Sequence, residues 1–536
     1  MATPPTNGSA AKSFDIIIVG GGFGGCYLLH RLRKLGFSIR LIEAGSSLGG
    51  VWHWNRYPGA RVDSEIPYYQ YTLREVWRDF TWSQRFPSHD ELKSYFAHVD
   101  RALDLSRDVQ YSTAVTGAQW DPKAGRWTVQ TNNGYEVTCR FLLPATGSSY
   151  KRHEPDFLGM RTAFRGVVAH AAAWPEGGID YTSKKVAIIG AGATGLQVVQ
   201  EMSKTAGQTM VYIRQPNIAL PMGQRELTPL EQRAQKAVYG GLFKLAKAAG
   251  SGIAGDVQSK TFGEMTTEER EEMCEELWGR GGFGFQSANV ADFLVNDEAN
   301  RALYDFWARK TRARISDPAK RDIVAPLERP YPFATKRSSL EQDYYECIDR
   351  VNVEVVSLKK TPIREFFGKG IATEDGTERE HDIVVLATGY DNMTGSLTSM
   401  DLRGTDGIDL KEREMFKAPT AFSNAPMFIE SQADLIIEFL ARLRNDGVSI
   451  VEPTAEAQEG WAKVIQDISD MTLFRQVKDS WYVGGNIPGK KREQLNYLGG
   501  MDRYAEVVSN AFKNYSNFRL SAKKSCQKKH CYDAYL

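Results

Sequence analysis

The sequence predicts an α/β fold in which one strand–helix–strand unit occurs twice. Each copy opens with a short β-branched run that ends in glycine, FDIIIVG at 14–20 and KKVAIIG at 184–190. A glycine-rich turn and a helical stretch follow, and a second strand closes each copy, at 37–44 and at 209–214. A buried strand that leads through such a turn into a helix is typical of Rossmann-like dinucleotide-binding domains. We therefore expect two of these domains.

Length and charge balance indicate a multidomain globular protein. The 536 residues are enough for about three or four domains. The 67 Lys and Arg residues nearly balance the 66 Asp and Glu residues, which leaves a net charge of +1. A chain so balanced has no overall field to hold a polyanion, so we expect no nucleic-acid partner.

Cysteine usage and hydropathy indicate an intracellular protein. The six cysteines are scattered and form no CxxC pair, which argues against a disulfide framework and against a zinc site. The N-terminal residues contain no apolar leader-like run, and no stretch approaches the roughly 18 apolar residues that a membrane span needs. We expect a cytoplasmic protein with no membrane partner and no metal site, and the sequence leaves its oligomeric state open, with a monomer plausible.

The first glycine motif is Gly20-x-Gly22-x-x-Gly25, directly after the first strand. Gly20 permits a tight turn, Gly22 lets the backbone approach a pyrophosphate, and Gly25 lets the helix pack closely on the strand. Glu43 ends the second strand, where a carboxylate accepts hydrogen bonds from a ribose diol. This arrangement predicts a site for FAD or NAD.

The second motif, Gly190-x-Gly192-x-x-Gly195, differs in charge from the first. Arg214 ends its second strand, at the position equivalent to Glu43. A guanidinium binds a 2′-phosphate as a fork, whereas a carboxylate repels it. The second copy therefore predicts an NADPH site. Chance placement of an exposed arginine is the alternative interpretation of Arg214.

Two Ala-Thr-Gly tripeptides, at 145–147 and 387–389, follow the strand-like runs RFLL and DIVVL. Small residues at a strand exit allow the chain to pass close to a cofactor.

Residues 225–325 differ from the rest, because they are charged and helically periodic. This pattern predicts a mostly α-helical insertion.

Two longer motifs carry a resemblance to a known family. The stretch GGVWHWNRYPGARVD at 49–63 matches [AG]-G-x-W-x-x-x-x-[FY]-P-[GM]-x-x-x-D. The linker between the two units matches F-x-G-x-x-x-H-x-x-x-W-P through Phe164, Gly166, His170 and Trp174. Together with the paired glycine motifs, these stretches resemble the signature of type I Baeyer–Villiger monooxygenases over roughly residues 14–520.

The resemblance implies an enzyme that uses FAD, NADPH and O₂ to oxidise a ketone. In this family NADPH reduces FAD, oxygen adds at the flavin C4a atom, and the peroxide attacks the ketone to give an ester or lactone. The segment PFATKRSSLEQDYY is similar to the catalytic stretch and implies that Arg337 stabilises the peroxide, held by Asp63. An arginine suits this role because its pKa lies above about 12 and it keeps its proton.

The resemblance also implies contacts to the two cofactors. Lys336 joins Arg214 on the 2′-phosphate, and Trp481 touches the nicotinamide-side ribose, although core packing is the alternative for Trp481. We interpret His170 as a hinge or supporting group rather than an acid or base. The remaining expected cofactor contacts, some of them on the flavin side, are Gly50, Trp52, Tyr69, Val115, Thr146, Thr194 and Gln197.

The chain departs from the family pattern in three places. Gln215 stands after Arg214, where the family has Thr or Ser. The strand that the family has after the second Ala-Thr-Gly is missing, since the charged stretch 411–414 runs straight to 419–424. The basic tail after Leu520 has no family counterpart. Because the missing strand would leave a sheet edge open beside the flavin, a flavin-poor, weakly active or non-catalytic relative is one alternative, and a flavin N- or S-hydroxylating enzyme is another.

These patterns predict an order of segments along the chain, in which each nucleotide domain is built from two separate stretches. The order is a disordered N-terminus (1–13), the first stretch of the FAD domain (14–150), the linker with the first stretch of the NADPH domain (151–222), the helical insertion (223–328), the second stretch of the NADPH domain (329–384), the second stretch of the FAD domain (385–520) and the basic tail (521–536).

Overall fold

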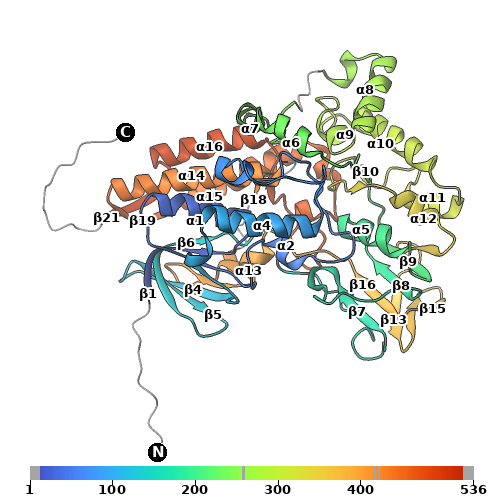
Figure 1. The fold of residues 1–536 in the computed structure, drawn as a ribbon, viewed down its shortest axis with the longest axis horizontal. Coiled ribbons are helices and arrows are strands. Elements are labelled where there is room, and N and C mark those ends of the chain that lie inside the picture. Colours follow the sequence, from blue (N-terminus) through green and yellow to red (C-terminus); the bar gives the residue numbers. More distant parts are fainter. Residues whose placement is uncertain (1–11, 256–259, 414–417, 421–422, 523–536) are drawn as a thin grey trace, which may run out of the picture.

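Two large sheets, one mixed and one parallel, form the frame of the protein, one in each half of the molecule. The computed structural model describes residues 12–255, 260–413, 418–420 and 423–522. Figure 1 shows the first sheet at the lower left, beneath the long C-terminal helices, and the second sheet at the lower right. The expected α/β architecture with two dinucleotide-binding-type units is confirmed.

The first sheet has seven strands in the order β17-β4-β5-β6-β1-β2-β3. Strand β1 lies near its centre and pairs in parallel with β2 and β6, while β4, β5 and β6 form an antiparallel meander. Helix α1 leaves the tip of β1 and packs against α14. The bounds are β1 Lys12–Val19, α1 Phe23–Lys34, β2 Ile39–Ile42, β3 Val109–Gln110, β4 Val115–Asp121, β5 Arg126–Thr131, β6 Val137–Pro144, β17 Asp401–Arg403 and α14 Ala425–Asn445.

The second sheet has five strands in the order β12-β9-β8-β16-β7, and all of its pairings are parallel. Its central strands are apolar on both faces, as parallel strands covered on two sides must be. The bounds are β7 Val167–His170, β8 Lys185–Ile189, α5 Ala193–Met202, β9 Gln208–Ile213, α12 Tyr344–Asp349, β12 Val353–Ser357, β13 Ile363–Phe367, β14 Gly370–Thr373, β15 Glu378–Glu380 and β16 Ile383–Leu386.

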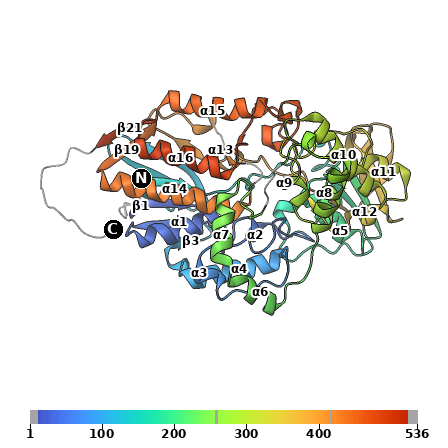
Figure 2. The same cartoon turned by 90° about the horizontal axis from the view of Figure 1, so that it is seen from above.

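The insertion is helical, as expected. Its helices α8 to α11, coloured green to yellow, lie above the second sheet in Figure 1. Helices α6 and α7 reach back to the first half, where α7 contacts α14 and α16. Figure 2 shows α7 crossing over α1 and α14. The bounds are α6 Pro229–Lys236, α7 Tyr239–Ala248, α8 Thr267–Arg280, α9 Gly284–Ser287, α10 Asp297–Arg312 and α11 Pro318–Val324.

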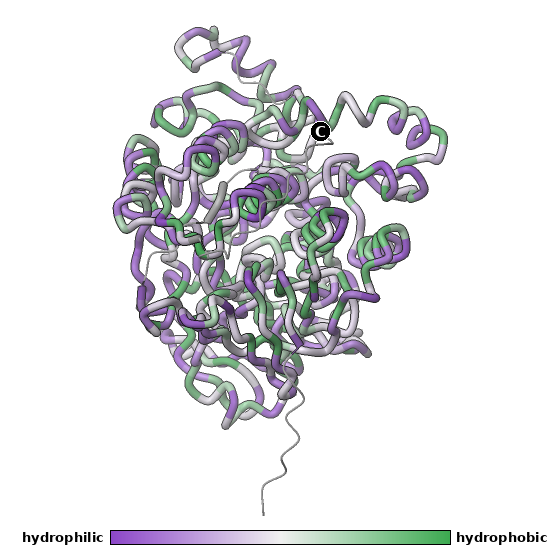
Figure 3. The backbone as a smooth tube through the Cα atoms, turned by 90° about the vertical axis from the view of Figure 1, so that its left-hand side faces the viewer, coloured by the Kyte–Doolittle hydropathy of each residue, from purple (hydrophilic) through white to green (hydrophobic). Residues whose placement is uncertain are grey.

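Further helices and a short antiparallel strand pair, β19 with β21, complete the described part of the fold. Helix α4 buries five apolar side chains, at i, i+3 and i+4 spacing, and exposes its charged residues. Figure 3 shows the outer helices carrying both hydrophilic and hydrophobic residues along their length. The bounds are α2 Val51–Trp54, α3 Arg74–Trp77, α4 His89–Leu103, α13 Gly395–Thr398, β19 Val448–Pro453, α15 Ala455–Asp470, α16 Met501–Asn514 and β21 Phe518–Ala522.

The expected gap in the first sheet is present, with one correction. From Arg140 to Pro144, β6 pairs with β1 alone among the described residues, because its pairing with β5 ends at Cys139. A short strand, β18 (Ala418–Thr420), does form after the second Ala-Thr-Gly, contrary to expectation. It pairs with β20 (Asn496–Tyr497) outside the seven-stranded sheet, so no strand of the described segments pairs with the outer edge of residues 140–144 of β6.

Several ends differ from the expected ones because tertiary pairing extends the strands. Lys12 and Ser13, assigned to a disordered N-terminus, belong to β1 and pair with Val137 and Thr138. Ser521 and Ala522, assigned to the tail, belong to β21 and pair with β19. Val385 and Leu386, assigned to the second stretch of the FAD domain, belong to β16 and pair with β8 in the second sheet. The remaining residues of those two terminal segments, 1–11 and 523–536, lie outside the described residues.

Candidate active site

The first glycine motif forms the tight strand-to-helix turn that its spacing predicts. Gly20 has a φ of +105°, and a Cβ there would lie 2.7 Å from the Ala145 carbonyl oxygen. A Cβ on Gly25 would overlap the Gly20 carbonyl oxygen, so α1 packs directly on the end of β1. Gly22 is the N-cap of α1 and uses no side chain to cap it, which leaves the helix N-terminus open to an anion.

Glu43 lies beside this turn, one residue after β2. It is buried, and its two carboxylate oxygens accept hydrogen bonds from the backbone N–H groups of Gly21, at 2.5 Å, and Gly45, at 2.6 Å. Burial raises the pKa of Glu43, and the two backbone donors oppose that rise. Each oxygen keeps a lone pair after these bonds, so the carboxylate can still accept from a ribose hydroxyl.

The 49–63 stretch lies against the same turn. The Gly49 N–H donates to the Gly21 carbonyl oxygen at 2.9 Å, and a Cβ on Gly50 would lie 2.9 Å from the Gly22 Cα. Both residues of this Gly-Gly pair have positive φ. Trp52 lies in the short helix α2, and its indole N–H donates to the Tyr69 hydroxyl at 3.0 Å. The expected FAD contacts Gly50, Trp52 and Tyr69 therefore lie together next to the first motif.

The stretch also contacts the second unit. The Tyr57 hydroxyl donates to the Gln197 Oε1 atom at 2.9 Å, and Gln197 donates back to the Arg61 carbonyl oxygen at 2.9 Å. Thr194, at the start of α5, lies 3.5 Å from the Tyr57 hydroxyl. Thr194 and Gln197 therefore have partners in the first half of the chain, and they position the two nucleotide units relative to each other.

The second glycine motif repeats the geometry of the first. Gly190 has a φ of +120° and abuts the Ala387 carbonyl oxygen, while Gly195 abuts the Gly190 carbonyl oxygen. Gly192 caps α5, and a Cβ built on it would meet nothing within 4 Å. Each Ala-Thr-Gly thus packs its alanine carbonyl against the first glycine of one motif, with Thr146 and Thr388 following.

Positive charge gathers where the second unit would meet a 2′-phosphate. Arg214 follows β9 and is exposed, and its charge acts on Lys336. The Lys336 ammonium donates to the Gln215 side chain and lies 3.1 Å from the Asp479 carboxylate. The structure therefore brings Arg214, Gln215 and Lys336 together, and it adds an acid, Asp479, that sequence reasoning missed.

Arg337 and Asp63 lie together, although 274 residues separate them. The guanidinium donates to the Asp63 Oδ2 atom from Nη2, at 2.8 Å, and from Nε, at 3.2 Å. Burial disfavours the charged form, but the Asp63 carboxylate and the Tyr482 hydroxyl together outweigh this and raise the pKa of Arg337. A guanidinium held in this way stays charged at any physiological pH.

Two aromatic side chains complete the surroundings of Arg337. Its guanidinium carbon lies 4.9 Å from the centre of the Phe283 ring. The buried Tyr482 hydroxyl also interacts with it, and burial raises the pKa of Tyr482 to about 12 while Arg337 opposes the rise. Sequence reasoning missed both residues, although Tyr482 directly follows Trp481, an expected contact of the nicotinamide-side ribose.

The linker motif has a structural role in the second sheet. Strand β7 carries it beside β16, and Trp174 is buried. The His170 Nδ1 atom accepts from the Ala172 N–H at 3.1 Å, so its Nε2 atom bears the hydrogen that points at the His153 carbonyl oxygen, 3.3 Å away. Burial lowers the pKa of His170, which favours the neutral form. Phe164 packs on Phe366, and a Cβ on Gly166 would lie 2.5 Å from the Asp382 carbonyl oxygen.

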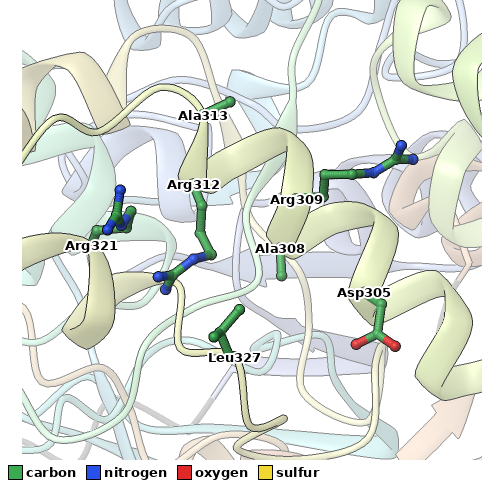
Figure 4. Close-up of a pocket in the computed structure, with 7 residues that line it drawn as sticks. All are labelled: Asp305, Ala308, Arg309, Arg312, Ala313, Arg321 and Leu327. Carbon is green, nitrogen blue, oxygen red and sulfur yellow. The ribbon is translucent and has the colours of Figure 1, made fainter. Parts of the chain in front are cut away.

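The other expected contacts are more dispersed. Val115 begins β4 and is partly buried against the apolar core of the first sheet. Trp481 is half-buried against Tyr482 in the 481–483 turn. A surface hollow on the insertion, shown in Figure 4, lies between α10 and α11. Its Arg309 and Arg312 side chains already bind Glu271 and Asp322. None of the residues that line it belongs to the glycine motifs or to the Arg337 cluster.

The residues present fit two dinucleotides. Two helix N-termini, free of side-chain caps, follow glycine turns in which a Cβ would block the approach, and one unit has a carboxylate where the other has cations. Residues 14–241 match the family model described as pyridine nucleotide-disulphide oxidoreductase. No helix within the described ranges is both long and apolar enough to cross a membrane.

Comparison with known proteins decides the family. A cyclopentanone 1,2-monooxygenase of Comamonas is 39% identical over 96% of this chain and 98% of its own length. A Baeyer–Villiger monooxygenase of Pseudooceanicola batsensis is 34% identical over 94% of this chain and 95% of its own. The chain belongs to the Baeyer–Villiger monooxygenases. The solved cyclohexanone monooxygenase of Rhodococcus sp. Phi1, bound to NADP⁺, matches this Baeyer–Villiger monooxygenase with a TM-score of 0.91 and 31% identity, over 96% of this chain and all of that one.

Family membership confirms the resemblance carried by the long motifs. Several relatives bear the names of ketone-oxidising enzymes, another is named a phenazine N-monooxygenase, and one solved relative is a complex with FAD and NADP together. The expected enzyme class, an FAD- and NADPH-dependent monooxygenase, is thereby confirmed for this Baeyer–Villiger monooxygenase, and the comparisons support it over the N- or S-hydroxylating alternative.

Proposed function

We propose that this chain inserts one oxygen atom of O₂ next to the carbonyl of a ketone, giving an ester or lactone. FAD would lie at the first glycine motif, with its ribose on Glu43 and its ring toward Trp52 and Tyr69. NADPH would lie at the second motif, with its 2′-phosphate on Arg214 and Lys336. When bound, FAD supplies the reduction of oxygen that NADPH drives.

The observation that carries this proposal is the ion pair of Arg337 with Asp63. Oxygenation of a ketone needs a nucleophilic, negatively charged oxygen species, and a cation that cannot give up a proton stabilises it. Arg337 is such a cation, because Asp63 raises its pKa further. N- and S-hydroxylation need no fixed cation of this kind. The Arg337–Asp63 ion pair therefore favours oxygenation of ketones over these two reactions.

The segment boundaries follow from the same assignment. Residues 12–150 and 387–522 would form the FAD domain, because β1 begins at Lys12, β16 of the second sheet ends at Leu386 and β21 ends at Ala522. The two stretches 151–222 and 329–386, on either side of the 223–328 insertion, would form the NADPH domain. We also propose that the enzyme works in the cytoplasm, since the four cysteines of the described residues are free thiols. The proposal covers linear, cyclic and steroid ketones.

Substitution of Arg337 tests the proposal. We expect Arg337→Ala to lower ketone oxygenation at least about 100-fold, because one preorganised charge contributes that much to such a step. Flavin reduction by NADPH, followed anaerobically, should survive. A ketone panel scored for ester and for hydrogen peroxide is the measurement, and Arg225→Ala, which removes an exposed arginine paired with Glu231, is the control.

The rival functions give different outcomes. Oxygenation of an amine or thioether probe in preference to every ketone, insensitive to Arg337, would show an N- or S-hydroxylating enzyme. Negligible NADPH oxidation with the whole panel would show a non-catalytic nucleotide-binding relative. Either result contradicts the proposal.

A further inference from the structure

One short segment contacts two adjacent cations of the site. Lys336 and Arg337 are neighbours in sequence, and residues 479–482 reach both of them. Asp479 lies 3.1 Å from the Lys336 ammonium, and Tyr482, three residues later, interacts with Arg337. The Lys336–Asp479 pair is partly shielded from solvent, with side-chain exposures of 17% and 30%.

The charges around Lys336 leave room for one more anion. Burial lowers the pKa of Lys336, Asp479 opposes this, and the nearby Arg214 adds to it. Asp479 brings one negative charge to the two cations Arg214 and Lys336, which leaves these three side chains with a net positive charge. Gln215, which also accepts a hydrogen bond from Lys336, brings no charge. A phosphate carries between about −1.5 and −2 charges at neutral pH, more than one carboxylate supplies.

A phosphate bound by Arg214 and Lys336 therefore meets Asp479. Lys336 has one ammonium with three donors, and Gln215 and Asp479 occupy two of them in this structure. A phosphate oxygen at the same ammonium either replaces the Asp479 carboxylate or shares the ammonium with it, and sharing brings two negative groups close together, where they repel each other. A nucleotide with a free 2′-hydroxyl has no charge there and is indifferent to Asp479.

We propose that Asp479 is an internal competitor for the 2′-phosphate of NADPH: it occupies Lys336 while the nucleotide is absent and is displaced when the phosphate binds. This inference rests on the proposed function, which assigns the 2′-phosphate to Arg214 and Lys336. Asp479 then sets how strongly the phosphorylated nucleotide is bound, without supplying a contact to it.

Isothermal titration with two small probes tests this directly. The probes are 2′,5′-ADP, which carries the 2′-phosphate, and 5′-AMP, which lacks it. We expect Asp479→Asn to tighten binding of 2′,5′-ADP about tenfold, because the substitution removes the competing charge while it keeps the shape of the side chain. Binding of 5′-AMP should stay within about twofold of wild type.

Three variants separate competition from a general effect. Asp343→Asn removes a carboxylate that pairs with Lys204 at 3.0 Å in the same domain, and it should change neither affinity. Asp479→Glu keeps the charge and should keep the wild-type affinity. In a Lys336→Met background, Asp479→Asn should lose most of its effect, because the cation for which it competes is gone.

The outcomes distinguish this inference from the function on which it rests. Unchanged or weaker binding of 2′,5′-ADP to Asp479→Asn, while the wild type still prefers 2′,5′-ADP to 5′-AMP, overturns the competitor alone. Equal binding of both probes to the wild type overturns the 2′-phosphate site itself, and the competitor with it. A tenfold gain that persists in the Lys336→Met background also overturns it.

Discussion

At the scale of single residues, Arg337 and Asp63 illustrate a contact whose value lies in position rather than stability. Their side chains are 33% and 23% exposed, so solvent screens the attraction. Ion pairs of this kind contribute about 1 kcal/mol or less to folding. The same carboxylate nevertheless fixes where the guanidinium lies. A shift of that charge by a fraction of an ångström changes how well it stabilises a reacting oxygen.

Asp63→Asn therefore separates the two roles. We expect ketone oxygenation to fall at least about tenfold, because the guanidinium loses the partner that orients it, while the melting temperature changes by only a few degrees. Steady-state rates and thermal melts are the measurements. Asp297→Asn, which removes a carboxylate 2.7 Å from Arg329, is the control and should leave the rate unchanged. Equal rates for wild type and Asp63→Asn would contradict the role of Asp63.

The residues found and those missed differ in what identifies them. Arg337, Lys336 and Asp63 stand in motifs with a recognisable spacing, and the structure brings them to one site. Phe283, Tyr482 and Asp479 belong to no such motif. They reach the site from the insertion and from a C-terminal segment, and only the packing of distant regions of the chain brings them there. Their one available signal was proximity in sequence to Trp481, which applies to Asp479 and Tyr482.

At the scale of elements, each nucleotide unit is a strand, a glycine turn and a helix held by close backbone contact. Glycine spacing in the sequence predicts this contact, because a helix can touch the end of its strand only where no side chain intervenes. In both units the alanine carbonyl of one Ala-Thr-Gly then lies against the first glycine. That second contact joins segments about 125 to 200 residues apart and is not visible in the spacing.

Gly25→Ala tests the contact between α1 and β1. The added Cβ would overlap the Gly20 carbonyl oxygen, so the helix must shift. We expect destabilisation of about 1–3 kcal/mol, seen as a lower melting temperature, together with loss of bound FAD. Gly240→Ala in α7 is the matched control, because nothing lies within 4 Å of its Cβ, and alanine there should be neutral or stabilise by up to about 1 kcal/mol. Equal melting temperatures for the two variants would refute the close-packing role.

Element ends were predicted less well than element identities. Lys12 and Ser13 look like a continuation of the polar N-terminus, yet they extend β1 because Val137 and Thr138 offer them hydrogen-bond partners. Ser521 and Ala522 extend β21 for the same reason, with partners in β19. Local composition contains no record of such partners, so the sequence could not place these ends.

At the scale of the whole molecule, the first sheet is completed by strands from distant regions of the chain. Strand β17 joins β4 across about 280 residues, and β6 joins β1 across the meander. Residues 140–144 of β6 pair on one side only within the described part of the chain. This one-sided stretch leads straight into Ala145–Thr146–Gly147, beside the first glycine motif.

We expect this open edge to weaken FAD binding. A strand that is paired on one side only is more mobile than one paired on both sides. The turn that follows this strand contributes to the proposed flavin site. Protein purified without added flavin should show, from its absorbance in the flavin band, less than one FAD per chain. Added FAD should then raise the melting temperature, since a ligand that binds only the folded state stabilises it. Stoichiometric FAD that survives desalting would rule out this weakening.

By itself, the sequence determined the local chemistry of this protein: two glycine turns, the opposite charges of Glu43 and Arg214, the helical insertion and the long motifs that carry the family. These depend on residues close together in the chain, where spacing alone decides backbone contact. Only the tertiary structure decided that Asp479 lies on Lys336, that Phe283 and Tyr482 surround Arg337 and that β18 pairs with β20 outside the first sheet. Each of these joins residues far apart in sequence, and such meetings depend on how whole elements pack rather than on any local preference.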